Sequence, residues 1–470
     1  MTSRQTKKIP PQPMPKLSIE KRRTSFEEVA LGYDWETAVL EAARCLQCKD
    51  APCIGGCPAD IDIPLFIRYI QEDNPAEAIR VIKEKNNLPA VCGRVCPQED
   101  QCQKACLLNK LGKPINIGWL ERFASDYELT HGISIPKISE SNGRHIAVVG
   151  SGPAGLTAAA DLARDGFDVT LFEGLHEFGG VLMYGIPEFR LPKKIVRVEV
   201  DYIGKLGVRL EKDTLIGRTI TIEELFEDGY DAVFVGTGAG TPRMLRIKGE
   251  NLNGIYSANE FLIRVNLMSA YEFPEWDTPV MRGERVAVIG GGNVAMDSAR
   301  SALRCGRKVC EDNEVTVIYR RTEKEMPARD DEIVNAREEG VKFIFLATPV
   351  EFSGNEQGWV RRATCIRMKL GEPDESGRCR PIPIEDGGFI DVDIDSAIIA
   401  IGQLSNRILL EATPNLKTTK WNTIEVNPET YETSIKNVYA GGDIVEGAAT
   451  VISAIGGGKR SAASIANNIS

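Results

Sequence analysis

The stretch His145-Ile-Ala-Val-Val-Gly150-Ser-Gly152-Pro153-Ala154-Gly155 joins a short apolar run to a glycine turn. A helix to about residue 164 follows, and then a second strand over residues 169–172 that ends at Glu173. Glycines let the backbone turn tightly beside a pyrophosphate, the helix N-terminus supplies N–H groups, and an acid after the second strand accepts bonds from a ribose. Together these features predict a dinucleotide-binding fold.

The same plan returns at Arg285-Val-Ala-Val-Ile-Gly290-Gly-Gly292-Asn293-Val-Ala295, followed by a strand over residues 315–319. In this copy Tyr319 stands where Glu173 stood, and Arg320 and Arg321 follow it. A missing acid and two arginines suit a 2′-phosphate, so we expect NADP(H) rather than NAD(H). The alternative is that both arginines lie on a solvated face.

The region after the first turn resembles the flavoprotein disulfide reductases with two dinucleotide domains. In that architecture the first fold and a Gly-Gly-Asp tail, here ending at Asp443, hold FAD, and the inserted fold holds the nicotinamide nucleotide. The cysteines of this region are Cys305, Cys310, Cys365 and Cys379, and none forms a Cys-x-x-Cys pair. We therefore expect structural or surface thiols and no disulfide chemistry.

Eight cysteines precede these folds in two blocks, Cys45-x2-Cys48-x4-Cys53-x3-Cys57-Pro58 and Cys92-x3-Cys96-Pro97-x4-Cys102-x3-Cys106. Structural zinc favours pairs of Cys-x2-Cys, and only the first two cysteines have that spacing. Cysteine followed by proline is typical of iron–sulfur sites, and clusters carry onward the single electrons that a flavin releases. The blocks therefore predict iron–sulfur clusters rather than zinc.

Residues 26–131 read as short helices without a strand, which predicts a small helical domain around the metal sites. Helix starts are expected at Ser25, at Asp62 and at Asn74, because each has the residue pattern of an N-cap. The arm over residues 1–24 is rich in lysine, arginine and proline. It is interpreted either as disordered or as packed on a partner chain.

The length, composition and net charge of the chain narrow the possible classes of protein. The chain has 470 residues, enough for two to four domains, with 42% hydrophobic and 26% charged residues, as in ordinary soluble proteins. A net charge of −10 argues against nucleic-acid binding, and no apolar run is long enough to span a membrane. Twelve cysteines without an export signal favour the reducing cytoplasm, and the three histidines show no metal-ligand spacing.

Over about residues 25–470 the chain resembles the NADPH-dependent glutamate synthase small (beta) subunit family. The marks are the two cysteine blocks, both glycine turns, Pro114-Ile-Asn-Ile-Gly118 and Tyr184-Gly-Ile-Pro-Glu-Phe-Arg-Leu-Pro192. Through Ala51-Pro-Cys-Ile and Leu370-Gly-Glu-Pro-Asp-Glu-Ser-Gly377 it resembles most the large subunit of electron-bifurcating NADH-dependent reduced ferredoxin:NADP oxidoreductases. The N-terminal half of dihydropyrimidine dehydrogenases is similar too.

The resemblance implies two 4Fe-4S clusters with interleaved ligands. One cluster would use Cys45, Cys48, Cys53 and Cys106. The other would use Cys57, Cys96 and Cys102, with Glu121 as its fourth ligand. Cys92 is then left over, although spacing alone would prefer it to Glu121, so both alternatives stay open.

The resemblance also implies the residues that hold FAD. These are Gly150, Gly152, Pro153, Ala154, Gly155, Glu173, Gly180, Arg190, Gly238, Gly442, Asp443, Thr450 and Val451. For NADP(H), the second glycine turn and the two arginines themselves, rather than the resemblance, predict the binding residues Gly290, Gly292, Asn293, Ala295, Arg320 and Arg321. Hydride transfer needs no side chain as acid or base, so no catalytic residue is named.

The expected fold class is α/β, with a small helical iron–sulfur domain before two Rossmann-like domains. The expected domains are an arm (1–24), the helical domain (25–142), the FAD domain (143–278 and 404–470) and the NADP(H) domain (279–403). The expected function is hydride exchange between NADP(H) and FAD with single electrons passing through the clusters. The partners would be a small flavin subunit and ferredoxin, in electron bifurcation with NAD, or alternatively a glutamate synthase large subunit.

Overall fold

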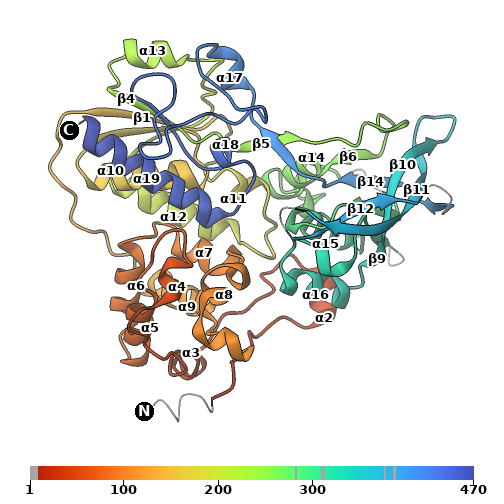
Figure 1. The fold of residues 1–470 in the computed structure, drawn as a ribbon, viewed down its shortest axis with the longest axis horizontal. Helices are drawn as coiled ribbons and strands as arrows, with labels where there is room; N and C mark the ends of the chain where they lie inside the picture. The colour runs from red at the N-terminus through yellow and green to blue at the C-terminus, as the bar shows by residue number, and fades with distance from the viewer. Residues whose placement is uncertain (1–8, 281–282, 308–312, 375–376, 385–387, 470) are drawn as a thin grey trace.

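Short helices make up the first part of the chain (Figure 1). The computed structural model describes residues 9–280, 283–307, 313–374, 377–384 and 388–469. The helices before residue 132 are α2 (Ile19–Thr24), α3 (Trp35–Ala42), α4 (Pro52–Gly55), α5 (Ile63–Gln71), α6 (Pro75–Lys83), α7 (Pro89–Val95), η1 (Gln98–Asp100), α8 (Cys102–Ala105), η2 (Leu107–Leu111) and α9 (Ile117–His131). As predicted, the described residues of this part contain no strand, only an isolated bridge between Lys16 and Ala30.

Two of the three predicted helix starts are confirmed. The Asp62 side chain accepts from the N–H of Leu65 at 3.2 Å to cap α5, and Asn74 accepts from Glu77 at 3.2 Å to cap α6. Both helices carry proline in the first turn, where a missing N–H costs nothing.

The helix start predicted at Ser25 is wrong. Ser25 ends α2 instead, and the chain continues extended. Phe26 is buried between the rings of Phe189 and Tyr271, with centroid distances of 5.8 and 4.6 Å. The N–H of Val29 donates to the carbonyl of Phe189 at 2.9 Å. These contacts with distant residues hold the segment extended, so its local helix signal is overridden.

The first nucleotide fold is a parallel sheet of order β16-β4-β1-β2-β3 between helices. Its elements are β1 (His145–Val149), α10 (Pro153–Arg164), β2 (Asp168–Phe172), α11 (Val181–Tyr184), α12 (Lys193–Lys205), β3 (Arg209–Glu211), α13 (Ile222–Glu227), β4 (Ala232–Val235), α17 (Ile408–Ala412), β16 (Val438–Ala440), α18 (Asp443–Glu446) and α19 (Val451–Ile469). Apolar runs such as Ile146 to Val149 are buried on both faces, as parallel sheets require. The C-terminal helix α19 lies along α10 (Figure 1).

The second nucleotide fold repeats this plan with a parallel sheet of order β6-β14-β7-β8-β9. Its elements are β6 (Ile255–Ser257), α14 (Ala258–Leu262), η3 (Ile263–Leu267), η4 (Ala270–Glu272), β7 (Arg285–Ile289), α15 (Asn293–Arg307), β8 (Glu314–Tyr319), η5 (Glu323–Glu325), α16 (Asp330–Glu339), β9 (Lys342–Phe345) and β14 (Ser396–Ile399). The two folds are joined by a two-stranded antiparallel ribbon of β5 (Ala239–Pro242) and β15 (Gln403–Ser405). The predicted α/β class with two Rossmann-like folds is confirmed.

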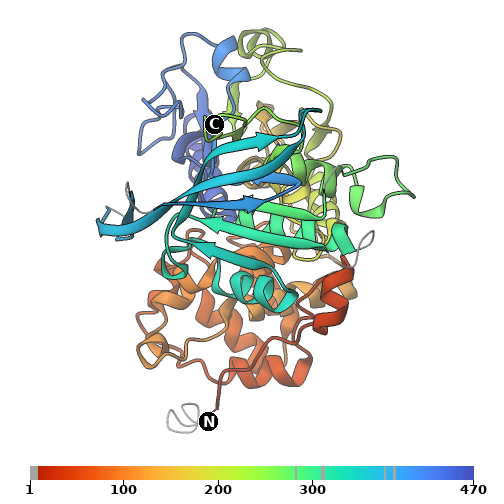
Figure 2. The same cartoon turned by 90° about the vertical axis from the view of Figure 1, so that its right-hand side faces the viewer.

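An antiparallel sheet that the sequence analysis did not foresee projects from the second fold (Figure 2). Its strands are β10 (Ala347–Gly354), β11 (Val360–Pro373), β12 (Cys379–Pro383) and β13 (Phe389–Asp393). Cys305 and Cys365 are buried, Cys379 is partly exposed, and Cys310 lies outside the described residues. Among the described helices, none is both long and apolar enough to cross a membrane.

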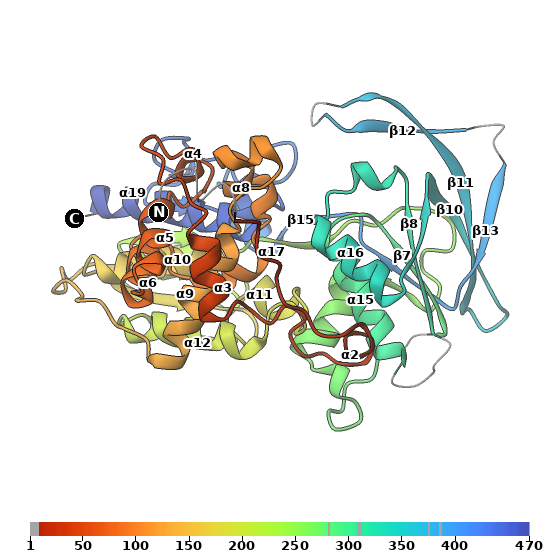
Figure 3. The ribbon, with the colours of Figure 1, turned by 90° about the horizontal axis from the view of Figure 1, so that it is seen from below.

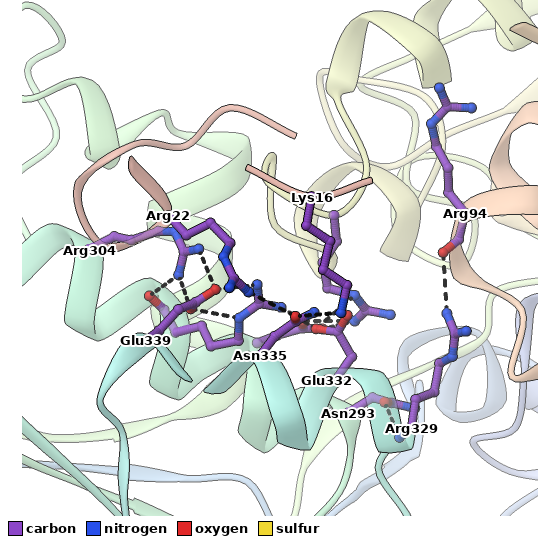
Figure 4. A network of polar contacts seen from close by, with 12 residues as sticks. Lys16, Arg22, Arg94, Asn293, Arg304, Arg329, Glu332, Asn335 and Glu339 are labelled. Atoms are coloured by element: carbon purple, nitrogen blue, oxygen red, sulfur yellow. Dashed lines mark hydrogen bonds and ion pairs between the residues drawn. The ribbon is translucent and has the colours of Figure 1, made fainter. Parts of the chain in front are cut away.

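Over its described residues the N-terminal arm packs on other parts of this chain, which neither interpretation included. Gln12 and Met14 pack on the helical domain, where the N–H of Gln12 donates to Glu41 at 2.8 Å. Further along the arm, α2 lies against α15 and α16 of the second fold, away from α3 to α9 (Figure 3). Arg22 donates to Asn335 at 3.0 Å and pairs with Glu338 at 2.6 Å, and Lys16 donates to Asn335 at 3.0 Å (Figure 4). The arm therefore ties the helical domain to the second fold.

A buried network of charges lies beneath this arm (Figure 4). Glu339 accepts from Arg300 at 2.7 and 2.9 Å and from Arg304 at 2.6 and 3.0 Å. The Arg304 guanidinium also stacks on the ring of Phe189, 4.0 Å from its centroid. Because buried charges need partners, these pairs hold α15 against α16, and the stacking of Arg304 on Phe189 is the contact that reaches the first fold.

Candidate flavin, nucleotide and iron–sulfur sites

The first glycine turn is shaped for a close ligand. Gly150 has φ +96°, and a Cβ there would lie 2.7 Å from the carbonyl oxygen of Gly236. A Cβ on Gly155 would lie 1.8 Å from the carbonyl oxygen of Gly150. Gly152 is the N-cap of α10, whose first turn holds Pro153 and Ala154. The turn therefore brings the N-terminus of α10 next to the carboxyl end of β1, as a pyrophosphate site requires.

Glu173 is directed at this turn from the end of β2. Its buried carboxylate accepts from the N–H of Ser151 at 3.0 Å and from the N–H of Leu175 at 2.9 Å, and the Ser151 hydroxyl also donates to it. These three hydrogen bonds fix the position of the Glu173 carboxylate at the end of β2.

The tail completes the same pocket wall. A Cβ on Gly180 would lie 2.9 Å from the Cα of Gly152, and a Cβ on Gly442 would lie 2.9 Å from the Cβ of Ala154. Asp443 follows Gly442, and burial raises its pKa to about 6. Thr450 precedes α19, and its hydroxyl accepts from the N–H of Ser453 at 3.2 Å while Val451 opens the helix. The glycines leave a cradle that side chains would fill, which fits a flat, phosphate-bearing group.

Gly238 lies two residues after Gly236, whose carbonyl oxygen borders Gly150, whereas Arg190 is paired with a residue of another fold. Gly238 has φ +69° and no atom within 4 Å of its Cβ position. Arg190 is buried and donates to both carboxylate oxygens of Asp297 at 2.7 Å. Asp297 belongs to α15, so the structure joins Arg190 to the second fold rather than to the first glycine turn.

The second glycine turn also has a backbone that only glycine suits. Gly290 has φ +145°, and a Cβ there would lie 2.2 Å from the carbonyl oxygen of Ala400. Gly292 and Ala295 lie at the start of α15, where Ala295 is buried. The Asn293 side chain accepts from the N–H of Arg329 at 3.0 Å (Figure 4).

Arg329 connects this turn to the helical domain. Its Nε donates to Glu99 at 2.9 Å, and its Nη1 donates to the carbonyl of Arg94 at 3.4 Å (Figure 4). Both partners flank Cys96 in the sequence. Arg329 thereby attaches the second glycine turn to the loop that carries Cys96. No local sequence pattern predicts this contact.

The two arginines after β8 differ in their surroundings. Arg321 is buried and donates to Asp374 at 2.9 Å and to the carbonyl of Cys379 at 2.7 Å. Arg320 is exposed and makes no hydrogen bond or ion pair with any described residue. Partial burial and the positive charges of Arg321 and Arg378 lower the pKa of Arg320. Asp374 neutralises Arg321, which leaves Arg320 as the arginine of the two that is free to bind a phosphate.

The cysteines implied for the first cluster lie together. Cys45, Cys48, Cys53 and Cys106 line one pocket, with Leu46, Pro52 and Leu107. Burial raises the pKa of Cys45 to about 11 and that of Cys53 to about 12, and neighbouring cysteines add to both shifts. Binding of a metal centre requires thiolates, so loading this outer set would release protons.

The residues implied for the second cluster also lie together. Cys57, Cys96 and Cys102 are buried, and so is Glu121. Burial and the nearby Glu121 and Cys96 raise the pKa of Cys57 to about 12. Among the described residues, no three of the His, Cys, Asp and Glu side chains are arranged to hold a single metal ion. Three buried thiols and one buried carboxylate are a donor set that an iron–sulfur cluster can use.

Comparison with known proteins agrees with this arrangement. Residues 22–133 match the family described as dihydropyrimidine dehydrogenase domain II, 4Fe-4S cluster, and residues 144–458 match the pyridine nucleotide-disulphide oxidoreductases. The beta subunit of NADP(+)-dependent formate dehydrogenase from Moorella thermoacetica is 39% identical, over 88% of this chain and 59% of its own length. The small chain of NADPH glutamate synthase from Escherichia coli K12 is 35% identical over 96% of both chains.

Solved structures show the same fold. FprA from Mycobacterium tuberculosis in complex with NADPH is 23% identical and covers 69% of this chain and 85% of its own, with a TM-score of 0.55. Thioredoxin reductase from T. acidophilum is 21% identical and covers 70% of this chain and 100% of its own, with a TM-score of 0.51.

The chain is therefore a pyridine nucleotide-dependent flavoprotein oxidoreductase with an iron–sulfur domain. It belongs to the pyridine nucleotide-disulphide oxidoreductase family, within a group of relatives that includes the NADPH glutamate synthase small chains. Its cofactors are FAD, NADP(H) and 4Fe-4S clusters. The chain spans about three fifths of the formate dehydrogenase beta subunit and nearly all of the glutamate synthase small chain.

Proposed function

We propose that this chain is the NADPH-oxidising subunit of a hetero-oligomer, with FAD in the first fold, NADP(H) in the second and two 4Fe-4S clusters in the helical domain. When bound, the flavin exchanges a hydride with the nicotinamide, and the clusters exchange single electrons. In this proposal the clusters are bound by two sets of residues: the outer set of Cys45, Cys48, Cys53 and Cys106, and the inner set of Cys57, Cys96, Cys102 and Glu121. The two glycine turns bind the nucleotides. The proposal keeps the domain boundaries that were expected from the sequence. It also places the protein in the reducing cytoplasm.

The contact between α19 and the inner cysteine set carries the proposal. A Cβ on Gly456 would lie 2.6 Å from the carbonyl oxygen of Pro58, which follows Cys57. The Gln101 side chain, one residue before Cys102, donates to the hydroxyl of Thr450 at 3.2 Å. The same end of α19 borders the flavin cradle at Gly442. One helix end therefore borders both the flavin site and the inner set, and its positive end favours a reduced, anionic flavin.

The burial of the cysteines indicates which of the two sets lies nearer the protein surface. Each cysteine of the inner set is buried, whereas those of the outer set are partly exposed. The outer set is therefore the side where a partner would collect electrons. Residues 101–120 beside it carry Lys104, Lys110 and Lys113, all exposed, and no Asp or Glu. In a chain of net charge −10, this local positive charge suits an acidic electron carrier.

The finer proposal is electron bifurcation with a small flavin subunit. One electron would leave through the clusters to ferredoxin, and the other would reach NAD through the partner, in either direction. The second candidate is electron supply to a glutamate synthase large subunit. The 96% coverage of the Escherichia coli small chain favours that alternative.

The deciding experiment uses the complex purified anaerobically from its source. NADPH oxidation is followed with NAD and with ferredoxin, each alone and then together. Oxidation that requires both acceptors at once supports bifurcation. Turnover with glutamine and 2-oxoglutarate, and with neither of the other acceptors, identifies the glutamate synthase subunit.

A further inference from the structure

Two helices meet closely at the inner cysteine set. A Cβ on Gly93 of α7 would lie 2.6 Å from the backbone nitrogen of Arg122 of α9. This backbone contact brings the part of α9 that carries Glu121 against the part of α7 that carries Cys92, because these two residues are the sequence neighbours of Arg122 and Gly93. Cys57, Cys92, Cys96, Cys102 and Glu121 are all buried in the same helical domain.

Asn86 holds one end of this carboxylate. The side chain of Asn86 is fully buried, and its Nδ2 donates to Glu121 Oε1 at 2.9 Å. Its Oδ1 accepts from the N–H of Leu88 at 2.9 Å. Because the carbonyl end is taken by an N–H donor, the amino end must face the carboxylate, and the orientation of the amide is fixed. Within the described residues, Glu121 Oε2 receives no hydrogen bond.

We propose that Asn86 is a positioning residue for the inner cluster: it holds Glu121 Oε1 and so presents Oε2 as a single-oxygen ligand to iron. This inference rests on the proposed function, in which Glu121 completes the inner set. A hydrogen bond to Oε1 withdraws charge from the carboxylate, which makes the ligand a weaker donor and raises the reduction potential of that cluster.

Cys92 then has a role without being a ligand. It is fully buried in α7, next to Cys96, Asn86 and Glu121. It fills the space behind the ligands, and the count of eight cysteines does not require eight cysteine ligands. The proposal thus predicts that Cys92→Ala keeps the full iron content.

The test uses the full chain, purified anaerobically, with iron content, EPR spectra of the reduced protein and midpoint potentials as readouts. Asn86→Ser is the informative variant, because a serine hydroxyl still reaches the N–H of Leu88 but falls short of Glu121. Asn86→Leu removes both bonds. Asn87→Ser is the matched control, since Asn87 donates to Asp161 at 2.8 Å and not to the inner set.

The expected result is unchanged iron content with one cluster signal shifted to a more negative potential in both Asn86 variants. Glu121→Gln, which keeps an oxygen but removes the charge, should shift the same signal to a more positive potential. The control should leave both signals in place. Should Asn86→Leu fail to fold, Asn86→Ser and Glu121→Gln still give the comparison.

Three outcomes would overturn the inference. The first is an Asn86→Ser protein in which neither signal moves. The second is a shift in the signal that Glu121→Gln leaves unchanged. The third is loss of one cluster in Cys92→Ala with no effect of Glu121→Gln, which makes Cys92 the ligand and leaves the proposed function standing. A wild-type chain without clusters would instead refute the proposed function itself.

Discussion

Gly456 of the C-terminal helix lies against the backbone of Pro58, so close that a Cβ on Gly456 would lie 2.6 Å from the Pro58 carbonyl oxygen. Pro58 follows Cys57 of the inner set, and Gly456 lies one turn into the helix that borders the flavin cradle. The loop that carries Cys57 thus lies directly against α19 at this point.

Gly456→Ala should weaken this junction. The added methyl group must push α19 away from the cysteine loop, at a cost of about 1–3 kcal/mol in stability. We expect NADPH to reduce the flavin at an unchanged rate and the clusters more slowly, as stopped-flow absorbance would show. Gly204→Ala in α12, whose Cβ would meet only Leu210 at 3.4 Å, is the control. If the clusters are reduced at the same rate in wild type, Gly456→Ala and Gly204→Ala, the contact at Gly456 is not part of the electron path.

Arg320→Ala should impair use of NADPH selectively. Loss of one charge-assisted bond to the 2′-phosphate costs about 1.5–3 kcal/mol, so KM for NADPH should rise roughly 10- to 150-fold. KM for NADH should stay nearly constant, and kcat with NADPH should change little. Equal effects on both nucleotides in steady-state kinetics would assign Arg320 to a merely solvated face.

Arg321→Ala should behave differently from Arg320→Ala. Arg321 is paired with Asp374 and holds the carbonyl of Cys379. Its removal leaves these groups without their cation, so we expect a lower unfolding temperature as the main effect. A variant with normal stability and a large loss in NADPH affinity would show that Arg321 also binds the phosphate.

Neutralising the lysines beside the outer set should slow transfer to an acidic carrier. We expect the triple change of Lys104, Lys110 and Lys113 to Gln to lower the rate constant for ferredoxin reduction and flatten its salt dependence. The matched control replaces Lys417, Lys420 and Lys436, which are also exposed but lie in the tail of the first fold. If both triple changes slow ferredoxin reduction equally, the lysines beside the outer set are not a specific docking site.

Glu199 should make stability depend on pH. Burial raises its pKa to about 8, although its carboxylate accepts from the N–H of Ala90 at 2.7 Å. The folded protein therefore holds a proton that the unfolded chain loses above about pH 4.5. Its contribution is fully present below that pH and is lost as pH rises through about 8.

Glu199→Gln should remove this dependence, because a neutral amide still accepts from Ala90 without a titrating proton. We expect the variant to gain more than about 1 kcal/mol relative to wild type at pH 8, and little at pH 5. Urea unfolding across this range measures the difference. Glu227→Gln, at an exposed site, should show no such trend. A constant difference between Glu199→Gln and wild type at every pH would refute the shifted titration.

Local patterns predicted much of the architecture. The strands at Ile146, Val169 and Val286 formed as expected, because apolar runs next to glycine turns have few alternatives in a parallel sheet. The family resemblance grouped the cysteines into two sets of ligands, which stay a prediction, and the four cysteines of the outer set line one pocket.

Features set by distant contacts could not be predicted. Phe26 overrides a helix start because Phe189 and Tyr271 enclose it, and Arg190 turns to Asp297 on another fold. The sheet of β10 to β13 was missed, although the alternating burial along β11 has a period-2 pattern in its sequence. Side-chain pairs such as Asn86 with Glu121 have no signature until the helices are packed.

The most direct test of the proposed electron path counts products. The isolated chain is fully reduced with titanium(III), freed of reductant and mixed with excess NADP+ under anaerobic conditions. A two-electron flavin and two one-electron clusters that share one path should yield about two NADPH per chain, with both cluster signals lost. A yield of about one NADPH, with both clusters still reduced, would contradict the account, because the flavin and the clusters would then not exchange electrons.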